Sequence, residues 1–245
     1  MCTVIVRFAP GTKWPLLLGA VRDEFADRAW DRPGRHWGDA LVGGRDRVAG
    51  GTWLAVDPGR PAVAALLNGV RLPVPSGGPR PTRGDLPVAA LRGEPLPDPA
   101  RYDGFHLVVG SPAGVDVWTW DGAALTHRAL DPGDHVIVNA GVDADTPLVA
   151  RLRRELAALP AATPAPALPV KEAWNGWLDL LGGCGVDPAG PDALVVRRIH
   201  DDRVYASTSA TLLALSPDSV RYDFTAPPGA GASWDEVAVQ FPRIG

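Results

Sequence analysis

The sequence predicts an α+β fold made mainly of antiparallel strands. Runs of β-branched and apolar residues fill the first part of the chain, helical patterns lie near its centre, and strand patterns return before the C-terminus. Strands that are grouped, rather than alternating with helices, predict antiparallel pairing instead of parallel βαβ units. Two facing sheets with helices outside satisfy this order, and so does a β-sandwich with one helical insertion. The 245 residues are expected to form one domain, 1–245, with a substantial core.

The first two expected strands form a hairpin at the N-terminus. β-branched residues predict a strand over residues 3–9, Pro10-Gly11 predicts a turn, and residues 14–20 predict the returning strand. Antiparallel pairing of these two strands brings residues 21–23 back towards Cys2.

The remaining elements follow from periodicity and turn residues. Apolar residues at helical spacing predict one helix from Thr146-Pro147 to Pro160 and another over 171–181, and a shorter helix over 86–92 ends at Gly93. Glycine, proline and polar residues predict loops over 26–51, 73–82 and 160–169. Further strands are expected at 52–56, 62–67, 105–109, 115–120, 124–130, 135–138, 194–199, 203–207, 210–215, 218–224 and 235–241.

Composition excludes several classes of protein. The net charge of −4 argues against a nucleic-acid surface, and two cysteines are too few for a disulfide framework. The sequence lacks a signal-peptide pattern and a run of ~18 apolar residues, so we expect a cytoplasmic protein with no integral membrane association. The five histidines lack the spacing of a zinc site, and we expect no metal and no cofactor.

Cys2 is the first candidate for chemistry. Removal of the initiator Met1 would leave Cys2 with a free α-amino group, whose pKa is near 8, a few ångströms from its own thiol. One residue would then supply the nucleophile and the proton acceptor that acyl transfer requires. The same residue also fits a buried apolar cysteine at the start of a strand.

Four polar residues are candidates to support this nucleophile. The hairpin places Asp23 where it could orient the Cys2 amine, and Arg22 where its charge could favour the thiolate. Asn68 and Asn139 each end an apolar strand and could donate a hydrogen bond to an oxyanion, although a strand-end Asn is more often a turn residue.

A small-molecule substrate or ligand is the expected partner. Arg71 is a candidate anion clamp because it lies three residues after Asn68. Trp30, Trp37 and Trp53 belong to a tryptophan-rich N-terminal quarter, and they are candidates to line a pocket for an apolar ligand. Packing in the core is the alternative role for these aromatic side chains.

An ordered set of motifs resembles the NRDE family, also called the transport and Golgi organisation 2 family. That family begins Met-Cys and carries Asn-Arg-Asp-Glu after a short strand, where this chain has Val21-Arg22-Asp23-Glu24. The further matching motifs are Arg32-Pro33, His36-Trp37, Gly43-Gly44-Arg45-Asp46, Gly50-Gly51-Thr52-Trp53-Leu54, Leu67-Asn68-Gly69-Val70-Arg71, Thr82-Arg83-Gly84-Asp85-Leu86, Tyr102-Asp103-Gly104-Phe105-His106-Leu107 and Val138-Asn139.

The family is similar to N-terminal-nucleophile hydrolases of the penicillin V acylase and bile salt hydrolase group. That likeness implies a four-layered αββα sandwich, with Cys2 as the nucleophile and Asp23 on its amine. The chain departs from the pattern at three positions. Val21 replaces an Asn, Ala20 stands where the acylases have an active-site Arg, and Thr208 replaces the Arg of a late Gly-Thr-Arg-Ser pattern.

The sequence is compatible with two functions. The first is an N-terminal-cysteine amidohydrolase or acyltransferase that acts on a small amide, ester or thioester. The alternative is a non-catalytic protein that binds or traffics haem or an acyl-lipid, which the missing arginines and proposals made for the family favour. The intact Cys2 and Asp23 favour the enzyme.

Overall fold

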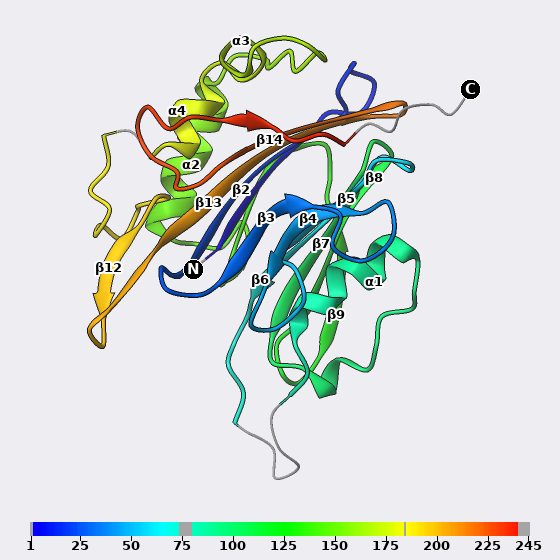
Figure 1. Ribbon diagram of the computed structural model, residues 1–245, viewed down its shortest axis with the longest axis vertical. Coiled ribbons are helices and arrows are strands. Elements are labelled where there is room, and N and C mark those ends of the chain that lie inside the picture. Colours follow the sequence, from blue (N-terminus) through cyan, green and yellow to red (C-terminus); the bar gives the residue numbers. More distant parts are fainter. Residues whose placement is uncertain (1, 74–79, 184, 240–245) are drawn as a thin grey trace.

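The computed structural model describes residues 2–73, 80–183 and 185–239 (Figure 1). Residues 74–79 of the loop expected at 73–82, and the last two residues of the strand expected at 235–241, lie outside these ranges.

Two antiparallel sheets form the body of the molecule. The first sheet has eight strands in the order β11-β10-β1-β2-β13-β14-β15, with β12 paired to β13, and the second has seven in the order β3-β4-β5-β6-β7-β8-β9. Strands of the first sheet are β1 (Thr3–Phe8), β2 (Leu16–Phe25), β10 (Gly133–Val138), β11 (Gly141–Val142), β12 (Arg197–His200), β13 (Arg203–Ser216), β14 (Ser219–Thr225) and β15 (Asp235–Glu236). Strands of the second sheet are β3 (Trp30–Gly34), β4 (Val42–Asp46), β5 (Leu54–Asp57), β6 (Ala62–Asn68), β7 (Phe105–Ser111), β8 (Gly114–Trp120) and β9 (Leu125–Ala129).

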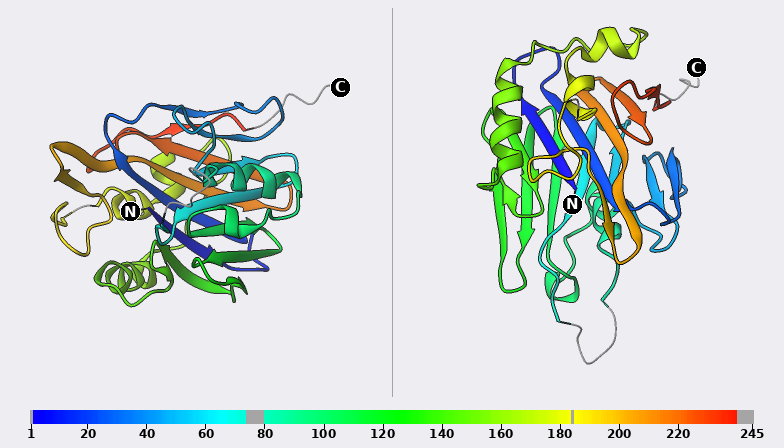
Figure 2. Two further views of the ribbon diagram at one scale, coloured as in Figure 1. Left: turned by 90° about the horizontal axis from the view of Figure 1, so that it is seen from below. Right: turned by 90° about the vertical axis from the view of Figure 1, so that its left-hand side faces the viewer.

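Helices cover the outer face of each sheet. Helices α2 (Pro147–Ala158), α3 (Val170–Trp174) and α4 (Trp177–Leu181) pack on the first sheet, whereas α1 (Leu86–Arg92) packs on the second. Figure 2 shows the same layers from two other directions. Thr146 caps α2 by accepting a hydrogen bond from the Val149 amide, and Gly93 ends α1 in the left-handed conformation at φ 74°. The short 3₁₀ helices are Arg83–Asp85 and Pro99–Arg101.

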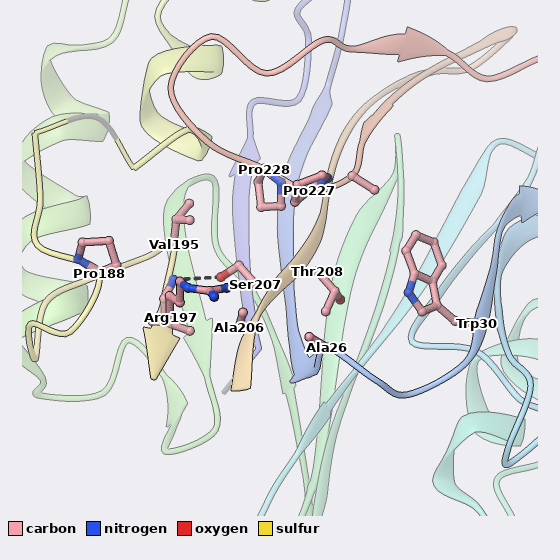
Figure 3. A pocket seen from close by; sticks show the side chains of 12 residues that line it. Ala26, Trp30, Pro188, Val195, Arg197, Ala206, Ser207, Thr208, Pro227 and Pro228 are labelled. Atoms are coloured by element: carbon pink, nitrogen blue, oxygen red, sulfur yellow. Dashed lines mark hydrogen bonds between the residues drawn. The ribbon is translucent and has the colours of Figure 1, made fainter. Parts of the chain in front are cut away.

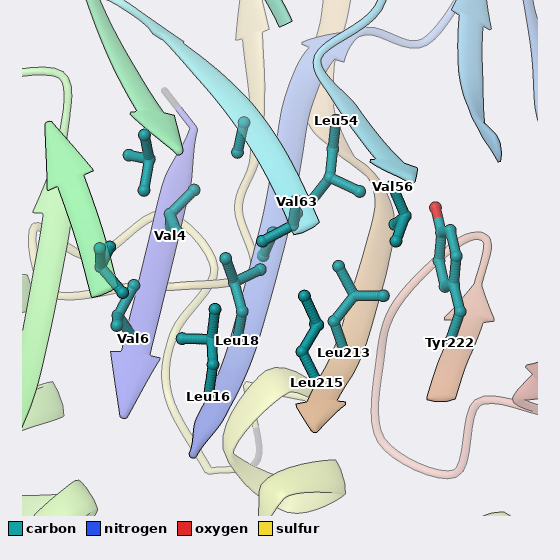
Figure 4. Packing of buried hydrophobic residues seen from close by; sticks show 14 of the residues in the cluster. Val4, Val6, Leu16, Leu18, Leu54, Val56, Val63, Leu213, Leu215 and Tyr222 are labelled. Atoms are coloured by element: carbon teal, nitrogen blue, oxygen red, sulfur yellow. The ribbon is translucent and has the colours of Figure 1, made fainter. Parts of the chain in front are cut away.

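The main core lies between the two sheets (Figure 4). Alternate residues of each strand point inward, as the two-residue period of a strand requires. Val4 and Leu18 of the first sheet therefore meet Leu54 and Val63 of the second, and all four side chains are almost fully buried. The opposite faces of the same strands pack against the helices, so the expected α+β class and the four αββα layers are confirmed.

The predicted N-terminal hairpin is confirmed, and its register positions the N-terminus. Thr3 pairs with Val21 of β2 on one side and with Val138 of β10 on the other. Cys2 therefore enters the sheet next to Arg22 and Asn139, which are distant in sequence. The 86–92 helix, and the helix that starts after Thr146, are confirmed as well.

The segment 26–51 was expected to be a loop, and this prediction is wrong because it contains β3 and β4. Its glycines suggested a loop, yet they serve close strand packing. A Cβ added at Gly43 would lie 2.4 Å from the Leu54 carbonyl oxygen, and one at Gly44 would lie 2.2 Å from the Trp53 ring.

Three other boundaries also differ from expectation. The helix expected over 171–181 is broken at Asn175, whose φ of 51° leaves the helical region, into α3 and α4. The strands expected at 203–207 and 210–215 form one strand, β13, because a bulge between Ser207 and Ser209 lets it continue. The strand expected at 135–138 begins earlier, at Gly133, as β10, and it pairs with β1.

Candidate functional site

Cys2 lies where the ends of β2 and β10 meet the start of β1. Its backbone nitrogen donates a hydrogen bond to Asn139 Oδ1 at 2.9 Å, and its Sγ lies 3.9 Å from the Asp23 carbonyl oxygen. The Cys2 side chain is half-buried, so the thiol is placed among ordered polar groups without being sealed in the core.

The two candidate asparagines form a chain of hydrogen bonds. Asn139 Nδ2 donates to the Asn68 carbonyl oxygen at 2.6 Å, which leaves Asn139 Oδ1 for the Cys2 nitrogen. His106 Nε2 lies 3.1 Å from the Asn139 carbonyl oxygen, and because a carbonyl can only accept, this nitrogen is the donor. Burial lowers the pKa of His106, so a neutral imidazole holds Asn139 in place.

Asp23 is buried beside Cys2 and is held by β13. The strand register places Ser207 opposite Asp23, and Ser207 Oγ donates to Asp23 Oδ1 at 2.6 Å. Tyr205 donates its hydroxyl to the Asp23 carbonyl oxygen at 3.2 Å. Burial raises the pKa of Asp23 to about 6, while the Ser207 hydrogen bond opposes this rise.

Arg22 is a buried cation that lines the same site as Cys2, and its side chain is 5% exposed. Its Nη1 donates to Thr208 Oγ1 at 2.9 Å, and its Nη2 lies 3.6 Å from Asp46 Oδ2. The guanidinium carbon stands 4.4 Å from the centroid of the Trp53 ring, which is a cation–π contact. Thr208 therefore anchors the Arg22 side chain.

The surroundings of Cys2 favour the thiol over the thiolate, because they raise its pKa. Burial raises the pKa of Cys2, the nearby Asp23 carboxylate raises it further, and Arg22 opposes the rise. A thiol in this environment needs a proton acceptor close at hand before it can act as a nucleophile.

A pocket of about 430 Å³ opens above Cys2. This size lies within the range that small-molecule sites occupy. Arginine and acidic side chains dominate its walls. The residues lining it that bear on the chemistry are Cys2, Arg22, Asp23, Asn68, Arg80 and Arg83.

A second, more apolar pocket of about 450 Å³ lies at the β13 bulge (Figure 3). Trp30, Pro227 and Pro228 form part of its wall, together with Ser207 and Thr208, whose hydroxyls bond to Asp23 and Arg22. The Trp30 ring packs edge-on against Trp53, which lines the Cys2 pocket, so the walls of the two pockets are in contact through these aromatic rings.

The other ligand-binding candidates are dispersed. Trp37 packs beside α1 with its edge against His36, and it lines neither pocket. Arg71 is exposed and is not among the residues that line the Cys2 pocket. The structure thus gathers Cys2, Arg22, Asp23, Asn68, Asn139 and Trp53, and places Trp30 in the neighbouring pocket.

Sequence reasoning missed four residues that shape the site. His106 and Arg83 lie within motifs that were recognised without a role, and Ser207 and Thr208 lie in the segment noted only for its absent Arg. Within the described ranges, no group of three or more His, Cys, Asp or Glu is placed to hold a metal ion. None of the described helices is long and apolar enough to cross a membrane.

Comparisons with known proteins address the N-terminal part of this site. The family model described as Transport and Golgi organisation 2 matches residues 1–173. No curated protein matches the sequence. Among solved structures, a Caenorhabditis elegans N-acylethanolamine-hydrolyzing acid amidase ortholog is similar with a TM-score of 0.46 and 11% identity, over 89% of this chain and 95% of that chain. The matched residues 1–173 include Cys2, Asp23 and Asn139, whereas Ser207 and Thr208 lie beyond them.

Proposed function

The chain belongs to the Transport and Golgi organisation 2 family, and we propose that it is a hydrolase or acyltransferase with Cys2 as an N-terminal nucleophile. Its substrate would be a small amide, ester or thioester. The backbone nitrogen of Cys2 supports this function, because it donates to Asn139 Oδ1 at 2.9 Å and Cys2 lines a pocket of substrate size. That arrangement would hold a free α-amine in a fixed orientation beside the thiol.

Removal of Met1 turns this nitrogen into the catalytic base. A free α-amine has a pKa near 8 and can take the thiol proton at neutral pH. The resulting ammonium donates to Asn139 Oδ1, and its charge lies beside the Cys2 thiolate and near the Asp23 carboxylate. The positive charge offsets the burial that raises the pKa of Cys2 in the unprocessed chain.

Acyl transfer then proceeds in two steps, acylation of Cys2 and release of the acyl group. The thiolate attacks the carbonyl carbon and forms a C–S bond, and the carbonyl oxygen takes the negative charge. Collapse of this intermediate breaks the bond to the leaving amine, alcohol or thiol, which receives the proton from the α-ammonium. Water, or a second acceptor, gives a proton to the amine, attacks the thioester and releases Cys2.

The hydrogen bonds separate the roles of the two asparagines. Asn139 uses its oxygen for the Cys2 nitrogen and its amide for the Asn68 carbonyl, so it orients the base. Asn68 lines the pocket, and its side chain makes no hydrogen bond with other described residues, so its amide is the group left to donate to the oxyanion. A donor of this kind typically contributes ~3 kcal/mol.

Turnover of matched acyl substrates tests this proposal. Native-start protein is assayed with the butyryl ester, thioester and anilide of chromogenic leaving groups. We expect activity on at least one of them, its loss in Cys2→Ala, and a ~10²-fold fall in kcat in Asn68→Ala. Cys184→Ser is the control thiol and should keep full activity. Equal rates for Cys2→Ala and the parent protein would refute the nucleophile.

A second candidate function is the binding of an acyl-lipid, and the apolar pocket beside Trp30 favours it. Trp30 fluorescence should then change on titration with a long-chain acyl ligand, with haem as the comparison ligand. Trp30→Phe removes the signal while leaving an apolar wall, and displacement of a fluorescent fatty acid measures affinity in both proteins. Unchanged signals with every ligand would remove this second function.

A further inference from the structure

Arg80 and Arg83 form a positively charged wall of the Cys2 pocket. Both follow the segment after β6, and both line the pocket together with Cys2. We propose that these two arginines bind a carboxylate or phosphate group on the acyl donor, so that the pocket selects anionic substrates. This inference rests on the proposed acyl-transfer function and names the substrate class for it.

The charges of the pocket are unevenly distributed between its walls. On the side of β2 and β4, the cations Arg22 and Arg28 pair with the carboxylates of Glu24 and Asp46, and Asp23 adds a third carboxylate to this wall. On the opposite side, Arg80 and Arg83 have Asp103 as the acidic residue lining the pocket. An anionic group would therefore be attracted to the second side and repelled from the first.

Arg83 offers donors that the described residues do not use. Its Nη1 donates to the Gly104 carbonyl oxygen at 2.7 Å, which fixes the guanidinium plane. The described residues supply it with no ion pair, although the side chain is half-buried. A guanidinium has five N–H donors, and its planar fork matches a carboxylate or a phosphate. Arg83 is thus fixed in position with spare donors.

Arg80 adds a second set of incompletely satisfied donors. Its Nη1 donates to the Pro73 carbonyl oxygen at 2.8 Å and forms an ion pair with Asp103 Oδ1 at 3.3 Å. Its Nε is buried and has no hydrogen-bond partner among the residues that the structure describes. A buried donor without a partner is costly, and a ligand oxygen would relieve that cost.

The backbone next to Arg83 packs directly against residues 51–52, which precede strand β5 of the second sheet. The Thr52 amide donates to the Gly84 carbonyl oxygen at 2.9 Å. A Cβ added at Gly51 would lie 2.3 Å from the Gly84 carbonyl carbon, so the two backbones touch. A cation held on such a rigid base loses little freedom when it binds an anion.

Binding to the inactive protein tests the inference without requiring turnover. Calorimetry with Cys2→Ala compares N-hexanoylglycine, a phosphorylated N-hexanoylethanolamine and the neutral N-hexanoylglycinamide. We expect at least one of the anionic ligands to bind at least ~10-fold more tightly than the neutral one, with the stronger of the two identifying carboxylate or phosphate. Arg83→Gln, in the Cys2→Ala background, should abolish that preference, and Arg80→Gln should reduce it.

The exposed Arg101 provides a control of equal charge change, and Arg101→Gln should keep the preference. Equal affinities for the three ligands, an unchanged preference in Arg83→Gln, or no binding at millimolar concentrations would overturn the inference. Failure of acyl transfer with a retained anion preference would instead refute only the proposed chemistry, because these measurements use the protein without its thiol.

Discussion

The charged Asp23 side chain beside Cys2 lowers the free energy of unfolding, because burial disfavours its carboxylate form. Burial raises its pKa to about 6, whereas an unfolded Asp titrates near 3.9. Between these pH values the folded protein binds more protons than the unfolded chain, so the free energy of unfolding falls as pH rises through this window. The whole penalty is present once the pH is well above 6, where the folded Asp23 is fully ionised.

Asp23→Asn should therefore stabilise the protein at pH 7 and change little at pH 4. The two pKa values correspond to a gain of about 2–3 kcal/mol in the free energy of unfolding at pH 7. Urea unfolding at both pH values measures it. The exposed Asp145 serves as a control, and Asp145→Asn should not show this pH dependence. Destabilisation by Asp23→Asn at pH 7 would mean that the charge is favourably paired.

At the level of single elements, the glycines of β4 are needed because neighbouring residues pack directly against them. Trp53 lies against Gly44 and carries Arg22 on its ring. Gly44→Ala would bring a methyl group within 2.2 Å of that ring and force Trp53 to move. We expect a loss of ~1–3 kcal/mol in the free energy of unfolding, as for other overpacked sites.

Denaturant unfolding, with near-UV circular dichroism as a probe of the tryptophans, measures this loss. Gly114 is the matched control because an added Cβ there meets no atom within 4 Å. Gly114→Ala should be nearly neutral. A Gly44→Ala protein as stable as the parent would show that Trp53 can shift freely.

Single elements were predictable from sequence where one local signal dominates. The Thr146 cap, the apolar spacing and Pro160 predict α2 almost to its ends. The predictions for β4 and for the 171–181 helix were wrong. The glycines of β4 are required by tertiary packing, and the break between α3 and α4 depends on the positive φ of the single residue Asn175. The helical periodicity across 171–181 arises because α3 and α4 bury the same face. It therefore predicts helix but not the break between the two helices.

At the scale of the whole molecule, a buried ion pair joins the helical layer to the first sheet. Arg221 and Asp223, both on β14, have side chains 1% and 0% exposed and an Nε–Oδ2 distance of 2.7 Å. Trp174 of α3 donates to the same Asp223 oxygen at 2.5 Å, and Arg221 donates to the Ala165 carbonyl oxygen at 2.6 Å. The pair thus connects β14 to α3 and to the 160–169 segment.

Asp223→Asn should cost ~3–5 kcal/mol in the free energy of unfolding, because it leaves Arg221 buried without its counter-charge. Thermal and urea unfolding measure this cost. The exposed Arg203–Asp27 pair offers a control, and Asp27→Asn should have little effect. A small loss in Asp223→Asn would show that water or the linker carbonyl compensates Arg221.

The sequence predicted only some of the residues that the tertiary fold brings together at the site. The hairpin brings Arg22 and Asp23 to Cys2 through local pairing, and sequence reasoning anticipated it. Pairing of β2 with β13 joins Asp23 to Ser207 across most of the chain, and no local pattern encodes that partnership. The same limit applies to Arg83, which reaches the pocket through contacts between glycine backbones.

In the proposed mechanism, Cys2 becomes the N-terminal residue and acts through its own amine. The most direct measurement is the intact mass of native-start protein, before and after a thioester acyl donor, for the parent, Cys2→Ala and Cys184→Ser. We expect a chain without Met1 that gains one acyl group in the parent and in Cys184→Ser, and none in Cys2→Ala. Retained Met1, or acylation that persists in Cys2→Ala, would contradict it.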